Sequence, residues 1–123
     1  MTINNVITLD RKFNGVVGVS AELAFDWLGT GEAVLIDVRE QEELEIEWIP
    51  GATAMPLSKF NPDNLPVMGT KKIIFICHTG RRSKEAAERL LTRGVFNVYN
   101  VKDGLLAWNA AGLASLDQSA LLI

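Results

Sequence analysis

The chain has 123 residues, of which 48% are hydrophobic and 22% are charged, and its formal net charge is −3. This composition is typical of a soluble globular protein, and the length predicts one domain over residues 1–123. The acidic balance argues against a nucleic-acid-binding surface. No stretch approaches the roughly 20 apolar residues of a membrane span, and residues 1–12 lack a signal-peptide core, so we expect a cytoplasmic protein without membrane contact.

The first elements along the chain are a strand, a helix and a second strand. A short strand at residues 18–19 leads into Ser20, a good helix N-cap, and Gly29 and Gly31 end the helix that follows. Residues 34–38 have the continuous apolar character of a buried strand, apart from Asp37.

The middle of the chain is less regular. Residues 40–48 are acidic and helix-prone, and Pro50 stops that helix, whose acidic side chains we interpret as a solvated face. Residues 52–56 predict a short strand, and residues 57–65 a weak helix or turn. This stretch contributes one further strand to the predicted sheet.

The last part of the chain repeats the strand–helix alternation. A strand over residues 72–76 precedes a helix that opens at Arg82 or Ser83 and closes at Gly94. A strand at residues 98–101 and a helix at residues 104–111 follow. The alternation predicts an α/β fold with a mainly parallel sheet of about five strands and helices on both faces, with Trp27 and Trp108 in its core. Residues 16–112 form the expected core, and residues 113–123 a tail without an assigned role.

The only cysteine, Cys77, stands at the end of the strand over residues 72–76. A single cysteine excludes an internal disulfide and a cysteine-based zinc site, and it fits a reducing compartment. Free cysteine is most often a small buried hydrophobe. Here, however, a loop with a glycine and two arginines follows, and then a helix whose N-terminus favours anions. This setting lowers the pKa of a thiol and predicts a nucleophile that acts on an anionic substrate.

Ligands in an open α/β sheet bind beyond the carboxyl ends of the strands. Arg39 follows the strand that carries Asp37, so both should lie at the same edge as Cys77. Arg39 can supply positive potential at the rim or orient the site, or it can pair with Asp37 or Glu40. For Asp37 we expect a structural hydrogen bond to neighbouring backbone.

Four segments together resemble the single-domain rhodanese family of sulfurtransferases, which implies a three-layer rhodanese-like fold. They are Leu35-Ile36-Asp37-Val38-Arg39-Glu40, Ile49-Pro50-Gly51-Ala52, Cys77-His78-Thr79-Gly80-Arg81-Arg82-Ser83 and Asp103-Gly104-Leu105-Leu106-Ala107-Trp108. They occur in family order and span nearly the whole chain. Two positions depart from the pattern: Trp48 stands where the family often has histidine, and Asp103 replaces the first of two glycines.

The resemblance implies a thiosulfate sulfurtransferase without cofactor or metal. Cys77 would take the outer sulfur of thiosulfate or a related persulfide donor as a persulfide, and then pass it to cyanide or a thiol. The substrate-binding residues would be His78, Thr79, Gly80, Arg81, Arg82 and Ser83. Because the chain has no second cysteine, the acceptor must be external, such as a protein thiol.

The loop residues also have alternative roles. Arg81 either binds the sulfonate of the donor or is solvated or paired with Glu85 or Glu88. Arg82 binds the donor or orients the loop. Ser83 supports the helix start or donates a hydrogen bond toward sulfur, and His78 is not needed as a base.

Three other functions compete with this interpretation. A related cysteine phosphatase needs five residues between cysteine and arginine, whereas four separate Cys77 from Arg82. A mercaptopyruvate sulfurtransferase lacks the paired arginines in its loop. A persulfide carrier or interaction module would load Cys77 but turn over small acceptors poorly.

Overall fold

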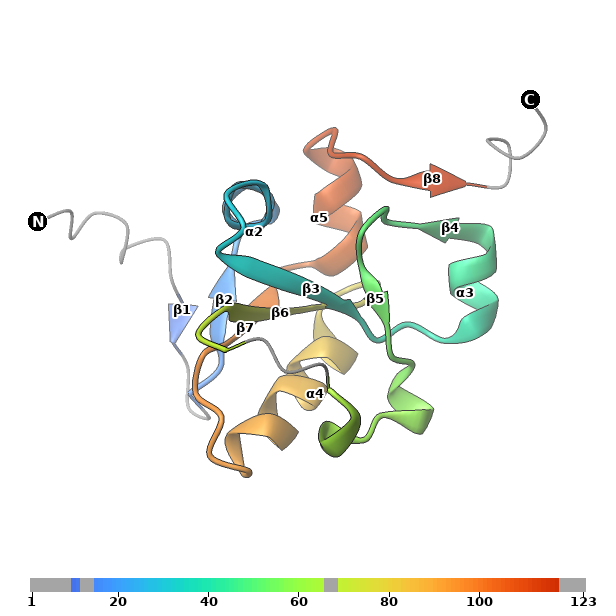
Figure 1. Cartoon of the computed structure of the whole chain (residues 1–123). Coiled ribbons are helices and arrows are strands. Elements are labelled where there is room, and N and C mark those ends of the chain that lie inside the picture. Colours follow the sequence, from blue (N-terminus) through green and yellow to red (C-terminus); the bar gives the residue numbers. More distant parts are fainter. Residues whose placement is uncertain (1–9, 12–14, 66–68, 118–123) are drawn as a thin grey trace, which may run out of the picture.

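The computed structural model describes residues 10–11, 15–65 and 69–117. A six-stranded sheet in the order β1-β2-β7-β6-β3-β5 forms its centre (Figure 1). Its strands are β1 (Asp10–Arg11), β2 (Val17–Val19), β3 (Ala33–Asp37), β5 (Thr53–Ala54), β6 (Lys72–Ile76) and β7 (Val98–Val101). β2, β7, β6, β3 and β5 are parallel, and only β1, at the edge, is antiparallel. The predicted α/β fold with a mainly parallel sheet is confirmed.

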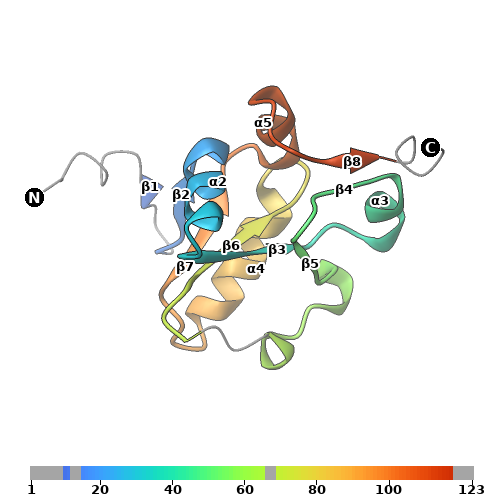
Figure 2. The ribbon, with the colours of Figure 1, turned by 45° about the horizontal axis from the view of Figure 1, so that its top comes forward.

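Helices cover both faces of the sheet (Figure 2). They are α2 (Ala21–Gly29), α3 (Gln41–Ile46), α4 (Arg81–Leu91) and α5 (Gly104–Ala110), together with the 3₁₀ helices η1 (Leu57–Lys59) and η2 (Pro62–Asn64). α2 and α5 pack on one face, and α4 packs on the other. The predicted cap of α2 is confirmed, since the Ser20 hydroxyl oxygen accepts from the backbone N–H of Leu23 at 3.0 Å. None of the described helices is long and apolar enough to cross a membrane.

The buried hydrophobic residues form two clusters, one on each face of the sheet, because successive side chains along a strand point to opposite faces. In β6, Ile74 and Ile76 join the core beneath α2 and α5. Ile73 and Phe75 join the core beneath α4, and so does Cys77, the next residue in the same register. The strand period therefore directs the thiol toward α4.

The acidic segment differs from its prediction. The helix ends at Ile46, and β4 (Glu47–Trp48) pairs antiparallel with β8 (Leu116–Asp117) of the tail. Trp108 fastens the tail further, because its indole N–H donates to the carbonyl of Ala114 at 2.9 Å. A strand partner 68 to 70 positions away is a tertiary contact that helix propensity does not report. Residues 118–123 of the tail lie outside the described residues.

Two other predicted boundaries also shift. The strand expected over residues 52–56 shortens to β5. Helix α4 begins at Arg81, one or two residues earlier than predicted, because Gly80 is in the left-handed region (φ 104°) and acts as the N-cap.

Candidate active site

Cys77 lies at the carboxyl end of β6, between the N-termini of α4 and α5, and its residue is fully buried. Its sulfur accepts hydrogen bonds from the backbone N–H of Gly80 at 3.1 Å and from the hydroxyl of Ser83 at 3.3 Å. Ser83 occupies the first turn of α4, where free N–H groups and the helix dipole favour negative charge. Sequence analysis assigned both residues to the loop after Cys77, and in the structure both lie within hydrogen-bonding distance of its sulfur.

The surroundings of the thiol act on its pKa in two opposite ways. Burial by itself raises the pKa of Cys77, because it disfavours the charged form. Hydrogen bonds from the Ser83 hydroxyl and from the backbone N–H groups of Ser83, Gly80 and Thr79 outweigh burial and hold the pKa below its ordinary value. The site thus favours a thiolate, the nucleophilic form of cysteine.

The N-terminus of α5 holds the loop from the other side. The backbone N–H of Leu105 donates to the carbonyl of Cys77 at 2.8 Å, and that of Leu106 donates to the carbonyl of His78 at 3.3 Å. Gly104 permits this approach, since a Cβ there would lie 2.3 Å from the Cys77 oxygen. The departure at Asp103 also fits, because the position has φ 58° and aspartate tolerates the left-handed region better than most residues.

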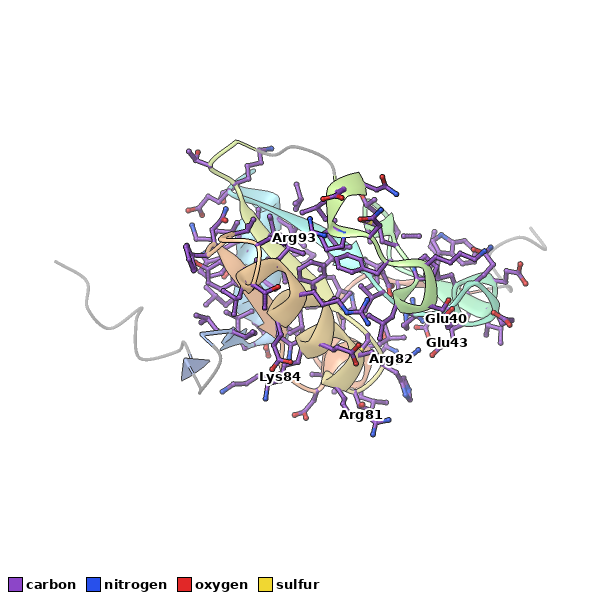
Figure 3. All side chains as sticks on the ribbon, turned by 90° about the horizontal axis from the view of Figure 1, so that it is seen from below. Glu40, Glu43, Arg81, Arg82, Lys84 and Arg93 are labelled. Carbon is purple, nitrogen blue, oxygen red and sulfur yellow. The ribbon has the colours of Figure 1, made fainter. Side chains whose placement is uncertain are left out.

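Arg82 is paired with Glu43 of α3. Its two terminal nitrogens donate to the two carboxylate oxygens at 2.6 and 2.9 Å, a bidentate arrangement (Figure 3). Chiefly through this hydrogen bond, Arg82 lowers the pKa of Glu43 to about 2, and Glu43 raises the pKa of Arg82. Of the two roles considered for Arg82, this geometry favours orienting the loop.

The acidic run is therefore more than the solvated face that we expected. Glu43 also accepts from the backbone N–H of Glu40 at 2.9 Å, and the carboxylate of Glu40 accepts from the backbone and hydroxyl of Ser58. Glu47 accepts from Asn109 and Ser115. These contacts tie the segment to distant parts of the chain, and charge pattern alone does not specify such partners.

Arg81 differs from its neighbour. It is exposed at the start of α4 and points away from Glu43 (Figure 3). Glu85, one of the two partners considered for it, instead binds Arg89 at the next turn. His78 and Thr79 are also exposed at this edge.

Asp37 and Arg39 form a buried ion pair at the end of β3. The guanidinium Nη2 of Arg39 lies 2.8 Å from Asp37 Oδ2, and the same nitrogen donates to the carbonyl of Glu47 at 3.0 Å. Asp37 also accepts from the backbone N–H of Arg39, as expected for a structural carboxylate. Of the alternatives for Arg39, the structure shows the pair with Asp37, which closes the strand end next to β6.

Sequence reasoning missed two side chains of the site, Glu43 and Asn100. Asn100 lies near the end of β7 and contacts both Gly80 and Ser83. Its place at the carboxyl end of a strand beside β6 was the available signal. Glu43 gave no such signal, because 39 positions separate it from Arg82.

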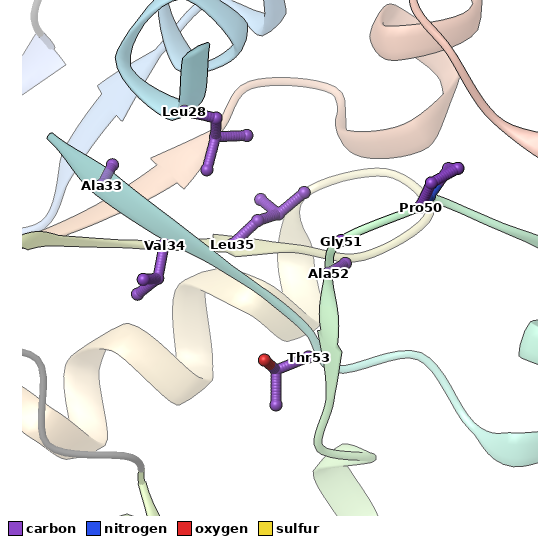
Figure 4. Close-up of a pocket in the computed structure, with 8 residues that line it drawn as sticks. All are labelled: Leu28, Ala33, Val34, Leu35, Pro50, Gly51, Ala52 and Thr53. Atoms are coloured by element: carbon purple, nitrogen blue, oxygen red, sulfur yellow. The ribbon is translucent and has the colours of Figure 1, made fainter. Parts of the chain in front are cut away.

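A pocket of about 320 Å³ lies away from Cys77, between α2, β3 and the segment before β5 (Figure 4). Its lining is Leu28, Ala33, Val34, Leu35, Pro50, Gly51, Ala52 and Thr53. It holds neither a charged side chain nor a residue of the loop, so we assign no chemistry to it. Within residues 10–11, 15–65 and 69–117, no group of three or more His, Cys, Asp and Glu side chains could hold a metal ion.

Comparison with known proteins points to one family. The family model described as "Rhodanese-like domain" matches residues 20–111. An uncharacterized protein of Synechocystis, slr1261, is 39% identical over 83 residues, which are 68% of this chain and 46% of that protein. The putative sulfur carrier protein YrkF of Bacillus subtilis is 38% identical over 60% of this chain and 40% of its own length. The chain thus spans less than half the length of either relative.

A relative of similar size and a solved structure extend the comparison. The thiosulfate sulfurtransferase GlpE of Actinobacillus succinogenes is 30% identical over 77% of this chain and 86% of its own. The crystal structure of a rhodanese-related protein from Thermoplasma volcanium superposes with a TM-score of 0.70 at 27% identity, covering 80% of this chain and 96% of that one.

Proposed function

The chain belongs to the rhodanese-like domain family, and from this premise we propose that it transfers a sulfane sulfur through a persulfide on Cys77. The observation that carries the proposal is the Cys77 sulfur, buried at a strand end and held by the N–H of Gly80 and the hydroxyl of Ser83. Relatives named as sulfurtransferases support sulfur transfer as the general activity. We further propose that the donor is thiosulfate.

In the first step the Cys77 thiolate attacks the outer sulfur of thiosulfate. A new S–S bond forms to Cys77, the S–S bond of the donor breaks, and sulfite leaves with its electron pair. This is covalent catalysis, which divides one transfer into two easier ones. The donors at α4 stabilise the negative sulfur before the attack, as an oxyanion hole does for oxygen.

In the second step an external acceptor attacks the outer sulfur of the persulfide. The acceptor keeps that sulfur, and the bond electrons return to Cys77 as the thiolate. Cyanide would leave as thiocyanate, and a thiolate would leave as a persulfide. Since Cys77 is the only cysteine of the chain, no internal thiol can take the sulfur.

Arg81 is the better candidate to attract the sulfonate of the donor. Its guanidinium is exposed beside the loop, whereas both terminal nitrogens of Arg82 already bind Glu43. An arginine fork matches an oxyanion such as sulfonate. We therefore assign Arg81 to donor binding and Arg82 to holding the loop.

Loading with thiosulfate tests the proposal. The protein is incubated with thiosulfate, its intact mass is recorded, and cyanide is then added and thiocyanate assayed. We expect a gain of one sulfur atom and thiocyanate production, with both signals lost in Cys77→Ser. A wild-type protein that shows neither signal would remove thiosulfate as donor, and a Cys77→Ser protein that keeps them would show that another group is the nucleophile.

A carrier role is the second candidate, and the relative named as a putative sulfur carrier favours it. A carrier would gain the sulfur but release it slowly to cyanide or small thiols. The same experiment separates the two roles, because the mass reports loading and thiocyanate reports turnover.

A further inference from the structure

Asn100 connects β7 to two residues of the cysteine loop, Gly80 and Ser83. Strand alternation places it on the face of the sheet that carries Val98 and α4. Its side-chain Nδ2 donates to the carbonyl of Gly80 at 3.0 Å, and its Oδ1 accepts from the hydroxyl of Ser83. The amide thus contacts two residues that also bind the Cys77 sulfur.

The orientation of this amide follows from its partners. The carbonyl oxygen of Gly80 can only accept a hydrogen bond, so the NH₂ group of Asn100 must face it and the amide oxygen must face Ser83. An amide oxygen in turn can only accept. The hydroxyl of Ser83 is therefore the donor in its contact with Asn100.

A hydroxyl carries one proton, and Ser83 has two acceptors in reach. One is Asn100 Oδ1, and the other is Cys77 Sγ at 3.3 Å. Ser83 can donate to only one of them at a time. Rotation about its C–O bond moves the proton between them, and no covalent bond breaks.

We propose that Asn100 is a positioning residue for Cys77: its amide oxygen holds the Ser83 hydroxyl while the sulfur is uncharged, and yields it when the thiolate forms. A hydrogen bond to a charged acceptor is stronger than one to a neutral amide, so the Ser83 hydroxyl donates to the sulfur when Cys77 is a thiolate. When Cys77 is a neutral thiol, the hydroxyl donates to Asn100 instead.

This change of acceptor by the Ser83 hydroxyl, the hydroxyl switch, also distinguishes the persulfide from the free thiolate, a step that rests on the proposed function. In a persulfide the negative charge lies on the outer sulfur, and the Cys77 Sγ is an uncharged bridging atom. The hydroxyl then returns to Asn100. Asn100 consequently favours the loaded state and the thiol over the free thiolate.

Other charged or titratable groups also lie at this edge of the sheet. They are Arg81 and Arg82 of α4, Glu43 of α3, His78 of the loop, Asp37 at the end of β3 and Arg39 after it, and Lys102 and Asp103 before α5. All of them are retained in the variants below. Differences among those variants therefore report the hydroxyl switch.

The test is the pH dependence of Cys77 alkylation by iodoacetamide, which needs no sulfur donor. Without the competing acceptor, Asn100→Ala should lower the pKa of the thiol by about half a unit to one unit. Ser83→Ala should raise it. In the Ser83→Ala background the Asn100 substitution should have little further effect, because the hydroxyl for which Asn100 competes with the sulfur is gone.

Two outcomes would overturn the proposal. One is an unchanged profile in Asn100→Ala, and the other is an equal shift with and without Ser83, which a merely loosened loop would give. If Asn100→Ala fails to fold, the near-isosteric Asn100→Asp replaces it. This variant should raise the pKa, and the increase should shrink when Ser83 is also replaced; an increase independent of Ser83 contradicts the switch.

The loading equilibrium with thiosulfate and sulfite gives a second readout. It should shift toward the free thiolate in Asn100→Ala by roughly the same 3- to 10-fold as the acidity. The two proposals fail separately. Normal loading without coupling between Asn100 and Ser83 removes the switch alone, whereas coupling without loading removes only thiosulfate transfer.

Discussion

Helices α4 and α5 both begin at the cysteine loop, and both follow a residue in the left-handed region, Gly80 and Asp103. Their first turns serve different atoms. The first turn of α4 directs the hydroxyl and N–H of Ser83 at the sulfur, whereas α5 directs the N–H of Leu105 at the carbonyl of Cys77. One helix stabilises negative charge on the Cys77 sulfur, and the other determines where the backbone of Cys77 lies.

The two helix starts are also held in place differently. α5 approaches the loop through close backbone contact, which depends on the missing side chain of Gly104. α4 is tied through Arg82 to a carboxylate on α3. Steric contact is independent of pH and salt, while a partly exposed ion pair depends on both. We therefore expect low pH or high salt to weaken the attachment of the α4 start but not that of the α5 start.

The largest effect is expected for Gly104→Ala. The new Cβ would lie 2.3 Å from the Cys77 oxygen, and φ at this residue is 49°. We expect the free energy of unfolding to fall by about 3 kcal/mol, from overpacking against backbone together with left-handed strain. Urea denaturation measures this loss.

Gly112→Ala is the matched control for that variant. Gly112 has φ 73°, but nothing lies within 4 Å of its Cβ position. It should lose only about 1 kcal/mol, the backbone part of the effect. Equal losses in the two variants would show that contact with the cysteine loop contributes nothing.

An intermediate effect is expected for Glu43→Gln. Because the folded-state pKa of Glu43 is lowered to about 2, its pairing contributes stability above the unfolded pKa and loses it as the pH falls from about 4.5 to 2. The carboxylate is partly exposed, so screening reduces this contribution to about 1 kcal/mol at neutral pH. The variant should be less stable by that amount and should lack this part of the acid dependence.

Denaturation midpoints between pH 2 and 7 measure this difference, with Glu42→Gln as the control. Glu42 lies on the same helix and is exposed, so its replacement should leave the profile unchanged. If Glu43→Gln keeps the wild-type acid dependence, the α4 end is not held by this pair.

The smallest effect is expected for Asp103→Gly. Glycine relieves the left-handed backbone but adds entropy to the unfolded chain and removes a charge near the start of α5. These effects offset one another, so the free energy of unfolding, measured by urea denaturation, should change by less than about 0.5 kcal/mol. A loss well above 1 kcal/mol would mean that the carboxylate of Asp103 makes a contact that the loop needs.

Sequence reasoning was strongest where local pattern and strand ends decide the structure. Continuous apolar runs located β3 and β6, and Ser20 located the start of α2. The rule that ligands lie at the carboxyl ends of parallel strands brought Cys77 and Arg39 to one edge. It was weakest for residues 40–48, where the helix gave way to β4 because a distant tail strand pairs with it.

The sequence by itself determined the fold class, the place of the cysteine at a strand end and the length of the loop after it, because these depend on residue periodicity and on spacing within one segment. Only the tertiary structure decided which partner each polar side chain takes. Glu43 binds Arg82 and leaves Arg81 exposed, and Asn100 shares the Ser83 hydroxyl with Cys77. Such choices depend on which atoms of distant segments come within hydrogen-bonding distance, and packing sets those distances.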